Sequence, residues 1–156
     1  MDSLETVNAM QPGRPSIPHC FSRRKGEGRG VLIPYLTAGY PDAETSLHLM
    51  TALARSGGDI LELGIPFSDP VADGPVIQAS YTRALERRVR LNEILHAVGV
   101  LSPALTMPIV TMVSYAIVYR HGPERYVKDA KAAGVAGAIV PDLLVEEADE
   151  FAAICR

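Results

Sequence analysis

A single glutamate interrupts an otherwise apolar run of this sequence. Glu62 lies between Leu61 and Leu63 and is followed by Gly64. Because side chains alternate along a strand, we expect Leu61 and Leu63 to face a layer of helices and Glu62 to face the opposite side. Burial there raises a carboxyl pKa, which suits a general acid or base near neutral pH. A purely structural carboxylate, bonded to a tyrosine or a backbone amide, is the alternative.

Two more carboxylates follow in the proline-containing loop at 65–75, IPFSDPVADGP. Gly74 permits a turn that would bring Asp73 over the end of the preceding strand. Two carboxylates that converge from different elements allow one to transfer protons while the other stabilises developing positive charge. The alternative for Asp69 and Asp73 is a surface turn with solvated acids.

The elements that must position these residues alternate between strand and helix. Apolar runs predict strands at 31–37, 59–64, 108–113 and 135–140, and one-sided apolar spacing predicts helices at 42–56, 76–86, 91–101, 124–133 and 146–156. Asn92 is the expected cap of the helix at 91–101. This order predicts a parallel α/β sheet covered by helices. The first strand–helix turn, TAGYPD, lacks the GxGxxG fingerprint of dinucleotide-binding folds, which leaves a (β/α)8 TIM barrel.

Only the first four βα units of such a barrel are expected in the chain. A complete barrel needs eight units and about 250 residues, so we expect a partial copy in residues 30–156, with its first and fourth strands left as edges. Residues 1–29 are predicted to be irregular, with Ile17 and Phe21 spaced to hold one short helix over the end of a core. The run Arg23–Lys25 is interpreted as a solvated turn rather than a phosphate site.

Functional side chains of parallel α/β folds gather where the strands end. This rule selects Tyr35 and Thr37 after the first strand, Ser114 and Tyr115 after the third, and Asp142 after the fourth. Tyr35, Ser114 and Asp142 are therefore candidate substrate-binding residues.

Composition excludes several classes of function. The net charge of −3, the absence of Trp and the few aromatic residues argue against binding to nucleic acid. No apolar run approaches the roughly 20 residues needed to span a bilayer, and the N-terminus lacks a secretory signal, so a cytoplasmic protein is expected. Cys20 and Cys155 lie in no CxxC or Cys/His cluster and are predicted to be free thiols, with a single disulfide between them as the alternative. No metal site and no cofactor are predicted.

Three segments resemble the tryptophan synthase alpha subunit family. Residues 61–78, LELGIPFSDPVADGPVIQ, are similar to its signature segment; 32–42, LIPYLTAGYPD, and 130–148, AKAAGVAGAIVPDLLVEEA, resemble its first and fourth units. The resemblance covers about residues 29 to 156. It implies cofactor-free cleavage of indole-3-glycerol phosphate to indole and glyceraldehyde 3-phosphate in tryptophan biosynthesis. It also implies a beta-subunit partner in an alpha2-beta2 complex.

The resemblance assigns roles to individual residues. Glu62 matches the glutamate that passes a proton to the indole ring carbon, and Asp73 matches the aspartate that holds the indole N–H. Tyr35 matches an aromatic position of the indole pocket. Pro66 and Asp69 fall in the part of the loop that meets the beta subunit.

The sequence also departs from the family. The usual aromatic pair followed by Asn-Pro is replaced at 114–117 by SYAI, Leu144 replaces a proline, and Pro18 and Arg24 weaken the N-terminal helix. The loops after strands seven and eight, which usually hold phosphate in such barrels, are absent from the chain. Besides the lyase, two hypotheses stay open: a non-catalytic module that binds and tunes a beta subunit, and a related barrel for another phosphorylated substrate.

Overall fold

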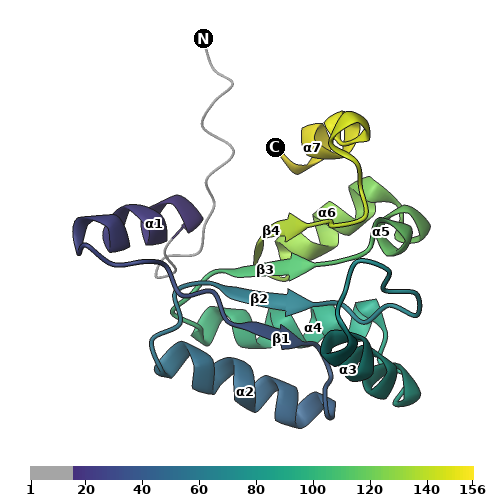
Figure 1. Cartoon of the computed structure of the whole chain (residues 1–156), viewed down its shortest axis with the longest axis horizontal. Coiled ribbons are helices and arrows are strands. Elements are labelled where there is room, and N and C mark those ends of the chain that lie inside the picture. The colour runs from purple at the N-terminus through teal and green to yellow at the C-terminus, as the bar shows by residue number, and fades with distance from the viewer. Residues whose placement is uncertain (1–15) are drawn as a thin grey trace.

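Four parallel strands form one sheet in chain order, β1-β2-β3-β4, in the computed structural model, which describes residues 16–156 (Figure 1). The strands are β1 (Tyr35–Thr37), β2 (Leu61–Gly64), β3 (Ile109–Met112) and β4 (Val135–Ile139). The helices are α1 (Ile17–Gly26), α2 (Ala43–Arg55), α3 (Pro75–Glu86), α4 (Leu91–Leu101), α5 (Tyr115–His121), α6 (Pro123–Ala132) and α7 (Asp149–Cys155). Short 3-10 turns occupy Ser102–Ala104 and Val145–Glu147.

The main core lies between the sheet and its helices. Leu61, Leu63 and Ile109 point out of one face of the sheet and are almost fully buried. They join one apolar cluster with Met50 of α2 and Val98 of α4. The predicted alternation around Glu62 is therefore confirmed. Each fully buried aliphatic side chain contributes about 1.5–3 kcal/mol to the stability of this layer.

Local signals explain where several helices begin. Asp42 caps α2, because its carboxylate accepts a hydrogen bond from the backbone N–H of Thr45 at 2.8 Å. The cap predicted at Asn92 is wrong: α4 begins after Arg90, whose backbone N–H donates to Glu93 at 3.1 Å.

Other boundaries differ from the sequence prediction. The strand predicted at 31–37 is regular only over Tyr35–Thr37. The Leu32 carbonyl still accepts hydrogen bonds from the segment that leads into β2, and the Pro34 carbonyl accepts one from the N–H of Glu62 in β2. Helix α5 was not predicted, and α7 begins at Asp149, after a 3-10 turn, rather than at 146.

Helix α1 covers the opposite face of the sheet near the N-terminal ends of the strands (Figure 1). Cys20 is fully buried there with Ile60 and Val110, and Ile17 packs against them. Ile17 also lies against Gly137 of β4: a Cβ atom built on Gly137 would meet the Cδ1 atom of Ile17 at 3.5 Å, an ordinary van der Waals distance. The predicted apolar pair is thus correct for Ile17 and wrong for Phe21, which is 50% exposed.

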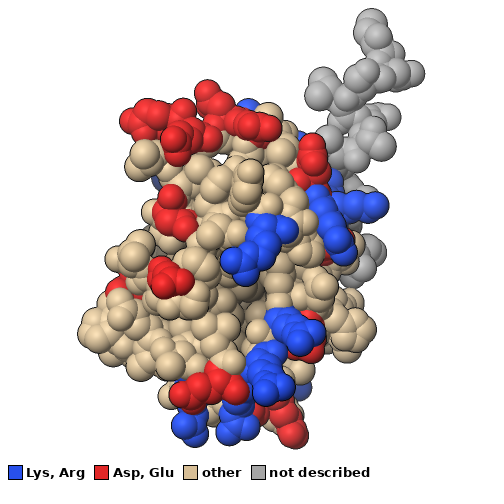
Figure 2. Space-filling view, turned by 90° about the vertical axis from the view of Figure 1, so that its right-hand side faces the viewer, with Lys and Arg blue, Asp and Glu red and all other residues tan. Residues whose placement is uncertain are grey.

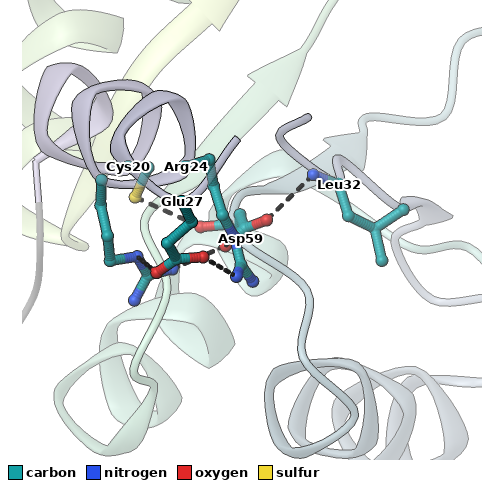
Figure 3. A network of polar contacts seen from close by, with 6 residues as sticks. Cys20, Arg24, Glu27, Leu32 and Asp59 are labelled. Atoms are coloured by element: carbon teal, nitrogen blue, oxygen red, sulfur yellow. Dashed lines mark hydrogen bonds and ion pairs between the residues drawn. The ribbon is translucent and has the colours of Figure 1, made fainter. Parts of the chain in front are cut away.

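Asp59 holds α1 to the sheet through a buried carboxylate (Figure 3). Its Oδ1 atom accepts hydrogen bonds from Arg23 at 2.6 Å and Arg24 at 2.7 Å, and Oδ2 accepts one from the backbone N–H of Leu32 at 3.0 Å. Glu27 in turn accepts from Arg24 at 2.7 Å. The interpretation of this arginine run as a solvated turn is wrong. We call Asp59, Arg23, Arg24 and Glu27 the α1 clamp.

Candidate functional site

Glu62 and Asp73 form the electrostatic centre of the site. Burial raises the pKa of Glu62, and the nearby negative charge of Asp73 raises it further. Burial likewise raises the pKa of Asp73. Neither carboxyl group has a hydrogen bond or ion pair within residues 16–156, so both remain available to a bound molecule. Such a pair can hold a proton on one carboxyl group at a higher pH than an isolated carboxyl group would, and present negative charge from the other.

The loop that carries Asp73 is tied to the start of α3 through its backbone. The side-chain amide of Gln78 donates to the carbonyl of Asp73 at 2.8 Å and to that of Pro70 at 3.4 Å. The backbone N–H of Asp73 also donates to the Pro70 carbonyl at 3.1 Å. These bonds fix the main chain, which leaves the carboxyl group of Asp73 the freedom to meet a ligand.

Four hydroxyl groups join β1 to α3 beside the two carboxyl groups. The Tyr35 hydroxyl donates to that of Tyr81 at 3.2 Å and lies 3.3 Å from that of Thr37. The Thr37 hydroxyl lies 2.6 Å from that of Ser80, which donates to a carbonyl of its own helix. We call Tyr35, Thr37, Ser80 and Tyr81 the hydroxyl cluster. Sequence reasoning selected the two residues of β1 but missed Ser80 and Tyr81. The helical spacing of Tyr81 and Ala84 could have identified the buried face of α3.

The ring of Tyr35 reaches the C-terminal end of β2. A Cβ atom on Gly64 would overlap the Tyr35 hydroxyl, so this position accommodates the ring only because it has no side chain. Burial raises the pKa of Tyr35, and the charges of Asp73 and Glu62 raise it as well. The tyrosine therefore stays protonated next to both carboxyl groups.

The structure brings Ser114 and Asp142 together at the ends of β3 and β4. The Ser114 hydroxyl donates to Asp142 at 2.6 Å, and the backbone N–H of Tyr115 donates to the same carboxylate at 2.8 Å. Ser114 also caps α5, accepting from the N–H of Ala116 at 3.2 Å. These contacts connect two neighbouring loops, and no hydrogen bond in the described part of the chain joins this pair to Glu62 or Asp73.

The two residues expected to meet a partner have different surroundings. Pro66 is buried, whereas Asp69 is exposed and accepts a hydrogen bond from Ser68 at 2.6 Å. Two apolar side chains nearby, Val71 and Val76, are 88% and 82% exposed. The outward part of this loop is therefore centred on Asp69 and Val71 rather than on Pro66.

Figure 2 shows the side of the molecule toward which the strands point: acidic side chains gather at the end that carries α7, and much of the remaining face is uncharged. Over the described residues, no group of three or more His, Cys, Asp or Glu side chains is arranged to hold a metal ion. Within the same range, no helix is both long and apolar enough to cross a membrane. Cys20 and Cys155 are free thiols, as predicted.

Comparisons with known proteins point to one family. The profile of the tryptophan synthase alpha chain family matches residues 21–156. The tryptophan synthase alpha chain of Rhodopirellula baltica is 48% identical over 143 residues, covering 87% of this chain and 50% of that protein. That of Acaryochloris marina is 45% identical over 136 residues, covering 87% of this chain and 51% of that protein.

Solved structures of tryptophan synthase also match the chain. Tryptophan synthase subunit alpha from Legionella pneumophila is 36% identical with a TM-score of 0.84, covering 87% of this chain and 52% of that one. Tryptophan synthase from M. tuberculosis, in an aminoacrylate- and BRD0059-bound form, is 39% identical with a TM-score of 0.83. This match covers 91% of this chain and 56% of that one. The chain thus spans about half the length of the proteins it matches, and its fold corresponds to four βα units of a (β/α)8 TIM barrel, as expected.

Proposed function

Because the chain belongs to the tryptophan synthase alpha chain family, we propose that the complete protein is a carbon–carbon lyase of tryptophan biosynthesis. It cleaves indole-3-glycerol phosphate to indole and glyceraldehyde 3-phosphate, with Glu62 and Asp73 as the catalytic pair. The observation that carries this proposal is the pairing itself: two partly buried carboxyl groups with raised pKa values and no hydrogen bonds of their own among the described residues.

Glu62 supplies the proton in the proposed mechanism. Its protonated carboxyl group donates to the indole ring carbon that bears the glycerol chain, which leaves the ring positively charged. Asp73 accepts a hydrogen bond from the ring N–H and stabilises that charge through its carboxylate. The carbon–carbon bond then breaks as the adjacent hydroxyl loses its proton and becomes the aldehyde, and the bond's electron pair neutralises the ring.

The raised pKa of Glu62 fits this role because a general acid must hold its proton near the working pH. Cleavage should therefore decline as pH rises through the pKa of Glu62. Tyr35 contributes one wall of the indole pocket, and Ser114 and Asp142 stabilise the loops that border the substrate.

Indole release by the complete protein tests the proposal. Replacement of a positioned general acid typically costs about 10²–10⁴ in rate, so we expect Glu62→Gln and Asp73→Asn each to reduce indole release by about that factor. The matched control is Glu124→Gln, a substitution of an exposed residue in the first turn of α6 that should leave the rate unchanged. Near-normal turnover by Glu62→Gln would refute the assigned role.

A beta subunit is the proposed partner, in an alpha2-beta2 complex that occupies the cytoplasm. Two observations support this: a solved relative is a tryptophan synthase from M. tuberculosis in an aminoacrylate-bound form, and the loop around Asp69 exposes Val71. Co-purification of the complete protein with a beta subunit should weaken in Val71→Asp. Co-purification without any indole formation would instead favour the non-catalytic module that tunes its partner.

A further inference from the structure

The place of the Asp73 carboxyl group depends on the main chain that carries it, because that group has no hydrogen bond or ion pair within the described residues. The surrounding turn, residues 70–74, has few other contacts to fix it. Val71 is 88% exposed, and Pro70 has no N–H to donate. Whatever connects this turn to the rest of the protein therefore decides where Asp73 lies.

Gln78 is the side chain that makes this connection. Its Nε2 atom donates a hydrogen bond to the carbonyl of Asp73 at 2.8 Å and a longer one to that of Pro70 at 3.4 Å. The Pro70 carbonyl also accepts the backbone N–H of Asp73 at 3.1 Å, so one amide group closes the turn from outside. Among the described residues, no other side chain forms a hydrogen bond with the backbone of residues 66–74.

Helix α3 gives Gln78 a fixed base. The backbone N–H of Gln78 donates to the Gly74 carbonyl at 3.0 Å in the first turn of this helix. One turn later, Tyr81 is only 3% exposed, and the Ser80 hydroxyl lies 2.6 Å from that of Thr37 in β1. Helical side chains lean toward the N-terminus of their helix, so a long side chain at position 78 reaches back over the loop. A path of contacts thus runs from β1 through α3 to the loop.

Both the length and the donor group of Gln78 are needed for this contact. Methionine has a similar length but no donor, and glutamate would turn a carboxylate toward two carbonyl oxygens. Gln78 is exposed, so its bonds contribute little to the stability of the whole fold. Their effect is local, on the path of the main chain at Asp73.

We propose that Gln78 is a positioning residue that holds the Asp73 carboxyl group near Glu62. The negative charge of Asp73 acts on Glu62, so the two carboxyl groups are neighbours while the loop is held in this way. The inference rests on the proposed function in one respect, since it takes Asp73 to be a catalytic residue. The hydrogen bonds of Gln78 do not depend on that role.

Indole release by the complete protein tests the inference through a double-mutant cycle. In Gln78→Met we expect kcat to fall by up to about 10²-fold, the cost of misplacing a catalytic group by about 1 Å. In the Asp73→Asn background the same substitution should cause little further loss, because the group that Gln78 positions is already gone. Gln78→Glu should lose activity as Gln78→Met does. The matched control is Arg83→Met, which removes an exposed polar side chain of α3 that does not bond the loop.

Carbon-13 NMR of labelled aspartate carboxyl groups follows Asp73 without any turnover, with Asp73→Asn assigning the resonance. Burial raises the pKa of Asp73. When Gln78→Met releases the loop toward solvent, this pKa should fall toward the ordinary aspartate value. Arg83→Met should leave it unchanged.

The inference is overturned if Gln78→Met lowers kcat by the same factor with and without Asp73, or if it leaves the pKa of Asp73 where it was. Full kcat in Gln78→Glu would overturn it as well. A lowered pKa of Asp73 in Gln78→Met, together with no indole release by the unmodified protein, would support the inference and refute the proposed function.

Discussion

Replacing Asp59 with asparagine should loosen α1 from the sheet. The carboxylate side chain is 1% exposed, and the Arg24 side chain that it meets is 14% exposed. Asparagine keeps one oxygen for the Leu32 N–H but turns an amide toward two guanidinium groups. A hydrogen bond to a charged group contributes about 1.5–3 kcal/mol, and the contact with Arg23 counts for less because Arg23 is 44% exposed. We therefore expect Asp59→Asn to destabilise the complete protein by about 2–3 kcal/mol.

Thermal unfolding followed by circular dichroism measures this loss. At about 2–4 °C per kcal/mol for a protein of this size, the midpoint should fall by about 4–12 °C. Amide hydrogen exchange should quicken first in residues 17–26, because the clamp is the polar anchor of that helix. The matched control is Asp129→Asn, which removes a carboxylate that is 38% exposed and paired with His121 and Arg125.

The effect of Asp59→Asn should also depend on pH. Burial alone would raise the pKa of Asp59, but the bonds from the Leu32 N–H and from Arg24 and Arg23 together outweigh it and lower the pKa. A lowered pKa stabilises the fold above the unfolded-state value of about 3.9, and this contribution is lost as pH falls through the folded-state value. The free energies of unfolding of the unmodified protein and of Asp59→Asn should therefore approach each other as the pH falls. A destabilisation no larger than that of Asp129→Asn, or one that persists unchanged in acid, would refute the role of the clamp.

Two further substitutions test the site. Gly64→Ala places a methyl group where the Tyr35 hydroxyl lies, so the ring must move and the KM for indole-3-glycerol phosphate should rise more than kcat falls; an unchanged KM would contradict the packing. Ser114→Ala removes both the cap of α5 and the bond to Asp142, which should lower the free energy of unfolding by about 1 kcal/mol in urea titrations. If Ser114→Ala unfolds at the same urea concentration as the unmodified protein, the link between the two loops carries no stability.

Regular, one-sided patterns made much of the fold predictable. The helix at 91–101 was placed correctly because Ile94, Leu95 and Val98 form a continuous apolar stripe, and all three are buried. The orientation of Glu62 followed from simple alternation. Its role as a catalytic acid, and that of Asp73, remain predictions that the proposed substitutions test.

Features that depend on distant partners could not be read in the same way. Arg23 and Arg24 look like a solvated run because the carboxylate that holds them, Asp59, is more than 30 residues away along the chain. Helix α5 is only seven residues long, too short for a periodic stripe, and Asp142 helps to hold its first turn from another loop. Tyr81 lies on a correctly predicted helix, but its contact with the site depends on the packing of that helix against β1, where its hydroxyl meets that of Tyr35.

The chain-order arrangement of the sheet has a consequence for synthesis. Within the described sheet, β2, β3 and β4 each pair with the strand that the ribosome made just before it, so none of these three pairings has to wait for a later segment. The clamp between α1 and Asp59 can close as soon as the second strand has emerged, while the third and fourth are still unmade. A nascent chain can therefore cover the base of its own sheet early, and each later unit docks on a surface that is already formed.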